Sequence, residues 1–347
     1  MKRSASRTWV ASAIAIVSSV AMVACASTPG SEQDQSAPGS QSGPLGELVA
    51  AAQEEGTLTY YTSQSPGIVE KLVPAFEAEY GIKVDLLRLN SGELQQRLNA
   101  EGESSRADIA ELPPDFFVSS AELFVDLSAE LVPSLAEVPE DLVGENSVVT
   151  SALPWIIGYN SDLVSDVPET WEDVVDDWAG EYVLTEPESS NGYMAFVNEI
   201  QKAFGDSVVE KLAANAGQIA SSGAGAAQQI AAGEFAITIP NYPGQLTPLI
   251  EQGASIDYVL PQEPAVVLPI TAGILANGPH QNAAQLFLNW LVSFDGQEAL
   301  CETGLAGAIL PPDAGLDGCV ELPEGWVTYA LDVDEDRRNE LLNLLGR

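Results

Sequence analysis

The chain has 347 residues, of which 46% are hydrophobic, with 51 Asp and Glu against 13 Lys and Arg. This length and composition suit one large or two medium globular domains, and they exclude a disordered chain and a disulfide-stapled mini-protein. A formal net charge of -38 argues against a nucleic-acid partner, because phosphate backbones are bound by clusters of Lys and Arg. The single histidine, His280, argues against metal sites and catalysis that need several histidines.

The N-terminal segment has the pattern of an export signal. Basic residues near the start precede an uncharged apolar run at 9–24, which is shorter than the ~20 residues of a spanning helix. Residues 1–24 are therefore predicted to be a secretory signal peptide, and Met22-Val23-Ala24-Cys25 resembles a bacterial lipobox, in which Cys25 is lipidated. An uncleaved anchor and a soluble export signal are the alternatives. Residues 25–44, which are rich in Ser, Gly and Pro, are predicted to be a flexible tether.

The globular body begins near residue 45 with alternating strand and helix patterns. In chain order they are a β-rich run at 57–61, helical spacing at 68–80, a strand-like run at 82–89, a helical run at 93–102 and another strand at 107–110. This alternation predicts an α/β fold with a mainly parallel sheet. Ligands bind such sheets at the carboxyl ends of the strands, so the loops at 62–67 and 90–92 are candidate binding loops.

A second region repeats the alternation without repeating the sequence. Thr170 and Asp173 have capping-box spacing at the start of a predicted helix. Further patterns are strands at 182–184 and 235–239, a helical run at 193–204 and a helix of small residues at 223–233. Two α/β regions predict two lobes, and the cleft between lobes is a common place for a small-molecule site.

Cys301 and Cys319 flank a short loop that is rich in Pro and Gly. In an oxidising compartment this pair is expected to form a disulfide that closes the loop. Two free buried thiols are the first alternative. A zinc site with two cysteines is the second, and the lack of a nearby histidine disfavours it.

Several segments of the body resemble one family when they are taken in order. They are EGTLTYYTSQSP, EAEYGIKVDLLRLNSGELQQRL, RADI, IGYNSDLV with VPETWEDV, AAGEFAITIPNYP and AQLFLNWLVSFDGQEAL. This series, over essentially residues 46–300, resembles the extracytoplasmic solute-binding proteins of ABC importers, in the group of iron(III)-, 2-aminoethylphosphonate- and polyamine-type binders. The resemblance implies a type II periplasmic-binding-protein fold, in which two α/β lobes close by hinge motion on a ligand in the interlobe cleft.

The resemblance also assigns parts of the chain to the two lobes. Residues 45–150 and 262–300 would form the first lobe and 151–261 the second, with 301–347 as a C-terminal extension packed on the lobes. The implied function is to capture a small solute outside the cell and deliver it to an ABC permease. The protein would act as a lipid-anchored monomer on the outer face of the cytoplasmic membrane, with no cofactor and no catalysis.

A cell-surface lipoprotein hydrolase is the rival class. The sequence contains no G-x-S-x-G elbow, no S-x-x-K arrangement and no Cys/His pair, so an activated nucleophile is not indicated. It also lacks a G-x-x-x-x-G-K phosphate loop, so ATP hydrolysis is expected to belong to another subunit.

Iron(III) is the alternative cargo within the family. Iron binders of this group use a His, a Glu and a Tyr-Tyr pair, and the matching positions here hold Ser65, a residue near Pro113, and Tyr242 followed by Pro243. A hard cation such as iron(III) needs several anionic oxygen ligands to replace its bound water. Of the four ligand positions, this chain keeps one phenol, that of Tyr242. Glu111 lies close enough in sequence for a shifted site, so an iron(III) binder with a reduced ligand set stays open.

Loops rich in hydroxyl groups replace the metal ligands. Hydroxyls and free N–H groups at helix N-termini favour a small anionic organic solute such as a phosphonate, a phosphate ester or a carboxylate, although capping is the ordinary role of a single Ser or Asn. For Trp155 and Tyr159, packing in the core is as good an explanation as a role in ligand binding. Arg88 is the first cation to test as a partner of an anionic ligand. No metal ligands are predicted. The predicted ligand-binding residues are Tyr61, Ser63, Ser65, Ser91, Gly92, Ser190, Asn191 and Tyr242.

Overall fold

The computed structural model of the protein describes residues 43–189, 191–261, 264–322 and 333–347. The predicted signal peptide at 1–24, the lipidation site Cys25 and nearly all of the tether lie outside the described residues. None of the described helices has the length and apolar character that crossing a membrane requires.

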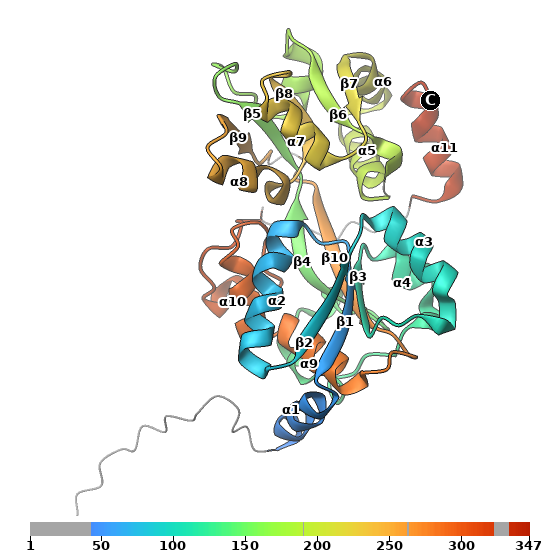
Figure 1. Cartoon of the computed structure of the whole chain (residues 1–347). Helices are drawn as coiled ribbons and strands as arrows, with labels where there is room; N and C mark the ends of the chain where they lie inside the picture. The colour runs from blue at the N-terminus through green and yellow to red at the C-terminus, as the bar shows by residue number, and fades with distance from the viewer. Residues whose placement is uncertain (1–42, 190, 262–263, 323–332) are drawn as a thin grey trace, which may run out of the picture. The chain divides into compact units, whose positions relative to one another are not determined.

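Helices and strands alternate along most of the described chain (Figure 1). The α-helices are α1 (Pro44–Glu55), α2 (Pro66–Tyr80), α3 (Ser91–Glu101), α4 (Asp115–Ser119), α5 (Asn191–Phe204), α6 (Asp206–Ala214), α7 (Gly223–Ala231), α8 (Pro243–Glu251), α9 (Gln281–Leu291), α10 (Phe294–Cys301) and α11 (Glu335–Leu344). The strands are β1 (Thr57–Thr62), β2 (Lys83–Arg88), β3 (Ile109–Leu112), β4 (Val148–Pro154), β5 (Ile156–Asn160), β6 (Tyr182–Thr185), β7 (Ala216–Ala220), β8 (Ile237–Asn241), β9 (Ile256–Val259) and β10 (Val267–Ile274).

The strands form two sheets with the same plan. The first has the order β2-β1-β3-β10-β4, and the second β7-β6-β8-β5-β9. In the first sheet β1 is parallel to β2 and β3, with Tyr60 opposite Leu86 and Ile109, while β10 is antiparallel to β3 and β4. In the second sheet β6 is parallel to β7 and β8, and β5 is antiparallel to β8 and β9. The predicted α/β fold is therefore confirmed.

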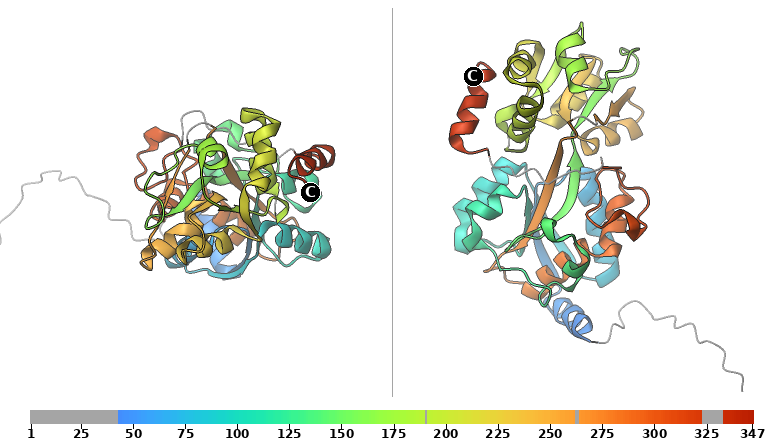
Figure 2. Two further views of the ribbon diagram at one scale, coloured as in Figure 1. Left: turned by 90° about the horizontal axis from the view of Figure 1, so that it is seen from above. Right: turned by 180° about the vertical axis from the view of Figure 1, so that it is seen from behind.

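Two neighbouring segments carry the chain between the sheets. β4 ends in the first sheet at Pro154, and after Trp155 the chain enters the second sheet as β5. After β9 it returns to the first sheet as β10, which pairs with β4 along its length (Figure 2). Trp155 thus lies at the point where the chain changes sheet.

Local signals in the sequence explain why α2 forms where it does. Pro66 occupies the first turn, and the helix ends before Gly81, whose φ of 72° is the left-handed conformation that glycine tolerates best. Its apolar face is buried, and the Phe76 ring lies 4.8 Å from that of Phe287 and 5.5 Å from that of Trp290. These contacts fix α2 against α9 and bring its N-terminus to the end of β1.

The predicted capping box at residue 170 is present. The Asp173 amide donates a hydrogen bond to Thr170 Oγ1 at 3.1 Å, and the Asp173 carboxylate accepts one from the Thr170 amide at 2.8 Å. The helix that follows is only a short turn with wider, π-type hydrogen bonding at Asp173–Asp177.

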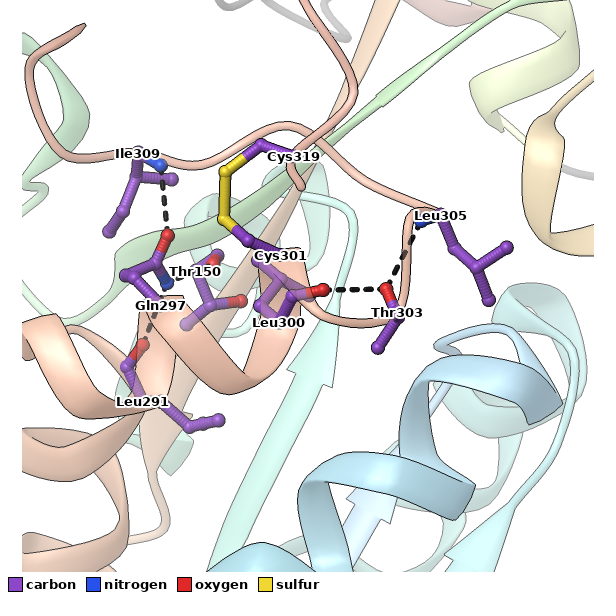
Figure 3. The surroundings of a disulfide bond; sticks show 9 residues. All are labelled: Thr150, Leu291, Gln297, Leu300, Cys301, Thr303, Leu305, Ile309 and Cys319. Carbon is purple, nitrogen blue, oxygen red and sulfur yellow. Dashed lines mark hydrogen bonds between the residues drawn. A yellow bond between two sulfur atoms is a disulfide. The ribbon is translucent and has the colours of Figure 1, made fainter. Parts of the chain in front are cut away.

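Cys301 and Cys319 form a disulfide, as expected from the sequence (Figure 3). A fully buried amide, Gln297, adds hydrogen bonds to the same region. Gln297 Nε2 donates to the Thr150 carbonyl at 2.9 Å and its Oε1 accepts from the Ile309 amide at 2.9 Å. The closed loop is therefore attached to both α10 and β4.

We expect the double replacement Cys301→Ser and Cys319→Ser to lower the free energy of unfolding by about 3 kcal/mol, because the bridge joins residues that are 18 positions apart in the chain. Urea denaturation measures this difference. A reductant should destabilise the wild-type protein by a similar amount and leave the double variant unchanged. Equal stability of the two oxidised proteins would contradict the expectation.

The C-terminal helix α11 lies beside α5 and α6 (Figure 2). Arg337 donates hydrogen bonds to Asn198 Oδ1 at 2.8 Å and to Gln201 Oε1 at 2.6 Å. Leu341 is buried below these contacts, and Arg347 forms an ion pair with Glu186. The last part of the extension thus packs on helices of the second sheet.

Candidate functional site

A cavity of about 350 Å³ is lined by loops of both sheets, and we call it the intersheet cavity. The first sheet contributes the loops after β1, β2 and β3, and the second sheet the loops after β7 and β8. In both sheets these loops follow the carboxyl ends of parallel strands. This is the edge at which ligands of open α/β sheets bind.

The N-termini of helices lie at the same cavity. α3 begins at Ser91 and α7 at Gly223, and both residues line it. Asn90 Oδ1 caps α3 by accepting from the Glu93 amide at 2.9 Å, and Ser222 Oγ caps α7 by accepting from the Gly225 amide at 3.1 Å. Capping is therefore the role of these two side chains. The positive ends of both helix dipoles favour an anion in the cavity.

Arg88, the last residue of β2, is half-buried and is the one basic side chain in the described lining. Its Nε donates a hydrogen bond to the Gln64 carbonyl at 2.8 Å. None of the ion pairs among the described residues includes Arg88. Its terminal nitrogens are therefore available for an anion from the cavity.

Three aromatic side chains form a wall of the cavity. The Trp155 ring lies 4.8 Å from the Tyr193 ring and 5.7 Å from the Tyr242 ring. Burial raises the pKa of both phenols, and a hydrogen bond from Gln245 and the charge of Arg88 offset part of this rise at Tyr242. Both phenols are therefore neutral at pH 7. The wall can stack on an organic group.

Three of the predicted ligand-binding residues line the cavity, namely Ser63, Ser91 and Tyr242. Ser65 is fully buried behind it, beside Gly244 of α8, where a side-chain carbon on Gly244 would lie 2.5 Å from Ser65 Oγ. Ser65 therefore packs where the first sheet's loops meet α8.

The other predicted residues do not line the cavity or are not described. Tyr61 is buried in an apolar cluster of the first sheet, and its hydroxyl accepts a hydrogen bond from Arg97 at 3.2 Å. Gly92 is not part of the lining. Ser190 and the side chain of Asn191 lie outside the described residues. Tyr159 is on β5 and packs against the core, whereas Trp155 is both buried and part of the cavity wall.

The sequence reasoning missed Tyr193 and the loop that contains Ser221 and Ser222. The loop had a usable signal, because Ser-Ser-Gly between a strand and a helix repeats the hydroxyl-rich pattern of the other loops. The preceding strand β7 has the sequence AGQIA, in which Ile219 is the single residue of high β propensity. Tyr193 belongs to the apolar face of a helix, where a tyrosine is expected in the core.

Glu111 on β3 is 1% exposed and does not line the intersheet cavity. Its carboxylate accepts hydrogen bonds from Thr62 Oγ1 at 2.8 Å, Thr150 Oγ1 at 2.5 Å, Gln64 Nε2 at 3.4 Å and the Tyr60 hydroxyl. Desolvation raises the pKa of Glu111, and the hydrogen bonds from these neutral donors act in the opposite direction. The described residues also include no group of three or more His, Cys, Asp or Glu that could hold a metal ion.

A second hollow, of about 630 Å³, lies between the turn near Pro139 and the loop at 308–322. Its charged side chains are the acidic Asp141 and Glu321, and it borders residues that the structure does not describe. Among the described residues that line it, none is a cation that could bind an anion.

A family model of bacterial extracellular solute-binding proteins matches residues 71–316, which is well over half of the chain. The chain belongs to the bacterial extracellular solute-binding proteins. It is therefore the solute-binding component of an ABC importer and acts outside the cytoplasm.

Individual members of this group and solved structures are similar to the chain. An Fe(3+)-binding periplasmic protein of Serratia marcescens is 27% identical over 278 residues, which cover 72% of this chain and 78% of that protein. Iron-bound HitA from Pseudomonas aeruginosa superposes with a TM-score of 0.65 at 23% identity, covering 84% of this chain and 98% of that one. AfuA from Actinobacillus pleuropneumoniae, with fructose-6-phosphate bound, superposes with a TM-score of 0.66 at 22% identity. The match covers 83% of this chain and 97% of AfuA. The predicted two-lobed type II periplasmic-binding-protein fold is thus confirmed.

Proposed function

We propose that this solute-binding protein captures a small organic anion, such as a phosphate ester, a phosphonate or a carboxylate, in the intersheet cavity. The observation that carries the proposal is Arg88, a cation without a carboxylate partner among the described residues, facing the cavity at which α3 and α7 begin. A charge-assisted hydrogen bond from a guanidinium is among the strongest polar contacts available to such a ligand. The aromatic wall would cover the organic part of the solute.

Two relatives suggest different cargo for the same fold. HitA is iron-bound, and AfuA has fructose-6-phosphate bound. For this chain, the positive charge of Arg88 in the lining disfavours a bare trivalent cation, which needs several anionic oxygen ligands, and the described residues include no group of three or more His, Cys, Asp or Glu that could supply them. An organic anion is therefore preferred to iron(III).

Isothermal titration calorimetry with a fixed panel tests the proposal. The panel consists of fructose 6-phosphate, inorganic phosphate, methylphosphonate, citrate, ferric citrate and spermidine. We expect an organic anion to bind without being converted and to raise thermal stability, by about 2.7 kcal/mol at a concentration of 100 Kd. Binding of ferric iron or spermidine alone would overturn the anion proposal, and product formation would favour the hydrolase alternative.

We further propose that binding closes two lobes, residues 45–150 with 262–300 and residues 151–261, through the paired segments β4 and β10. The change of sheet at Trp155 supports this, because the same residue lines the cavity. Trp155 is therefore both a wall residue of the proposed ligand cavity and the residue at which the chain passes from one sheet to the other.

We also propose that residues 1–24 are removed as a signal peptide and that Cys25 carries the lipid that anchors the monomeric protein outside the cytoplasmic membrane. The basic, apolar, small-residue and Cys order of the N-terminal segment supports this. We expect Cys25→Ser to move the protein from the membrane fraction to the soluble fraction. Mass spectrometry should find acyl chains on Cys25 in the wild-type protein, and an unmodified Cys25 there would contradict the proposal.

A further inference from the structure

Gln64 lies in the loop after β1, next to the cavity residue Ser63, and its side chain is fully buried. Its main-chain carbonyl accepts the hydrogen bond from Arg88 Nε at 2.8 Å. An arginine has five N–H donors in a rigid plane, so a fixed partner at Nε restricts the orientation of the terminal nitrogens. The position of the Gln64 carbonyl therefore sets the direction in which Arg88 presents its charge.

The side chain of Gln64 is held by hydrogen bonds that cross the first sheet. Its Nε2 donates to Ser151 Oγ at 2.6 Å and to Glu111 Oε1 at 3.4 Å. The main-chain N–H of Gln64 donates to Thr62 Oγ1 at 3.0 Å. The residue whose carbonyl contacts Arg88 is thus held by three hydrogen bonds to buried groups of β1, β3 and β4.

One of these groups belongs to a segment that joins the sheets. Ser151 is on β4, which continues through Trp155 into β5 of the second sheet. The hydrogen bonds therefore form a continuous path from Arg88 through Gln64 to the crossing strand.

Gln64 also has a buried amide oxygen, Oε1, without a hydrogen-bond partner among the described residues. An unpartnered buried oxygen costs stability, whereas an apolar side chain of similar size avoids that cost. The choice of glutamine here is therefore poorly explained by stability alone.

We propose that Gln64 is a positioning residue, which orients Arg88 toward the solute and ties that orientation to the crossing strand β4. The inference rests on the proposed function, in which Arg88 binds the anionic group. Gln64 itself acts through Arg88.

A double-mutant cycle tests this inference. The variants are Gln64→Met, Arg88→Ala and the pair of both, and calorimetry measures their affinity for fructose 6-phosphate, methylphosphonate and inorganic phosphate. We expect Gln64→Met to weaken binding about tenfold in the wild-type background and less than twofold in the Arg88→Ala background, because the positioned group is then missing. The urea midpoint of each variant is measured alongside, and the loss of affinity should depend on the presence of Arg88 whatever the change in stability.

Two further variants complete the design. Ser151→Ala removes the hydroxyl that accepts a hydrogen bond from Gln64 Nε2 and leaves the glutamine in place. It should weaken binding several-fold, and it tests the inference even if Gln64→Met fails to fold. Thr271→Val is the matched control, because Thr271 is a buried residue of the same sheet whose hydroxyl has no partner among the described residues. Its affinity should equal that of the wild type.

The outcomes separate the inference from the proposed function. Equal weakening by Gln64→Met in both backgrounds would overturn the positioning role alone. An Arg88→Ala variant with wild-type affinity, or a wild-type protein that binds none of the three anions, would overturn the proposed function and the inference with it.

Discussion

Replacing Arg88 with alanine is expected to weaken the binding of the organic anion about 100-fold, which corresponds to about 2.7 kcal/mol. Arg88 is the one basic side chain in the described lining of the intersheet cavity, which also contains Glu93, and none of the ion pairs among the described residues includes Arg88. Removing it deletes a charge-assisted contact with the anion. Calorimetry with fructose 6-phosphate and methylphosphonate measures the loss.

The charge and the geometry of Arg88 can be separated. Arg88→Lys keeps the cation but lacks the Nε donor that contacts the Gln64 carbonyl, so its affinity should lie between those of the wild type and the alanine variant. Arg106→Ala is the control for net charge, because Arg106 is exposed and lies outside the cavity lining. Equal losses in Arg88→Ala and Arg106→Ala would show that binding depends on overall charge and would remove Arg88 from the site.

Replacing Glu111 with alanine is expected to lower the free energy of unfolding by about 3 kcal/mol, because buried donors lose their shared acceptor. Thr62, Thr150, Gln64 and the Tyr60 hydroxyl all donate to this carboxylate. Urea denaturation measures the difference.

The pH dependence of stability should identify the same carboxyl group. Burial raises the pKa of Glu111, so the folded state binds this proton more tightly than the unfolded chain does. Its contribution to stability is then fully present below the ordinary glutamate pKa of about 4.3 and is lost as the pH rises through the raised pKa. Relative to Glu111→Gln, the wild-type protein should gain stability as the pH falls through this range.

Glu77 provides a control of opposite sign. Hydrogen bonds from Lys83 and the Val84 amide lower its pKa, so its contribution is present above the ordinary glutamate pKa and is lost as the pH falls through the lowered value. Relative to Glu77→Gln, the wild-type protein should lose stability as the pH falls. Slopes of the same sign for both pairs would contradict the assignment of the raised pKa to Glu111.

Much of the fold was predictable because its signals are local. The start and end of α2 follow from Pro66 and Gly81, and the capping box of Thr170 and Asp173 follows from residues three positions apart. The strand β7 was not predictable from its sequence, since its place in the sheet depends on pairing with β6 rather than on its own residues.

The candidate site was only partly predictable. Ser63 and Tyr242 follow strands directly, and such positions face the ligand edge of an α/β sheet. Tyr61 is two residues before Ser63, yet it lies in the core, because both faces of β1 are covered and the Tyr60-Tyr61 pair breaks the alternation of polar and apolar residues. Among the arginines of the first region, the sequence pointed to Arg88 as the first cation to test, and Arg88 lines the cavity.

The sequence by itself determined the acidic character of the chain, the export pattern of its first 25 residues and the α/β class, and it favoured a disulfide between Cys301 and Cys319 that the structure contains. These properties depend on composition and on residues close together in the chain. Only the tertiary structure decided that the loops of the two sheets share one cavity and that Gln64 joins Arg88 to Ser151. Those contacts connect residues far apart in sequence, and their geometry is set by sheet pairing and core packing that no local pattern encodes.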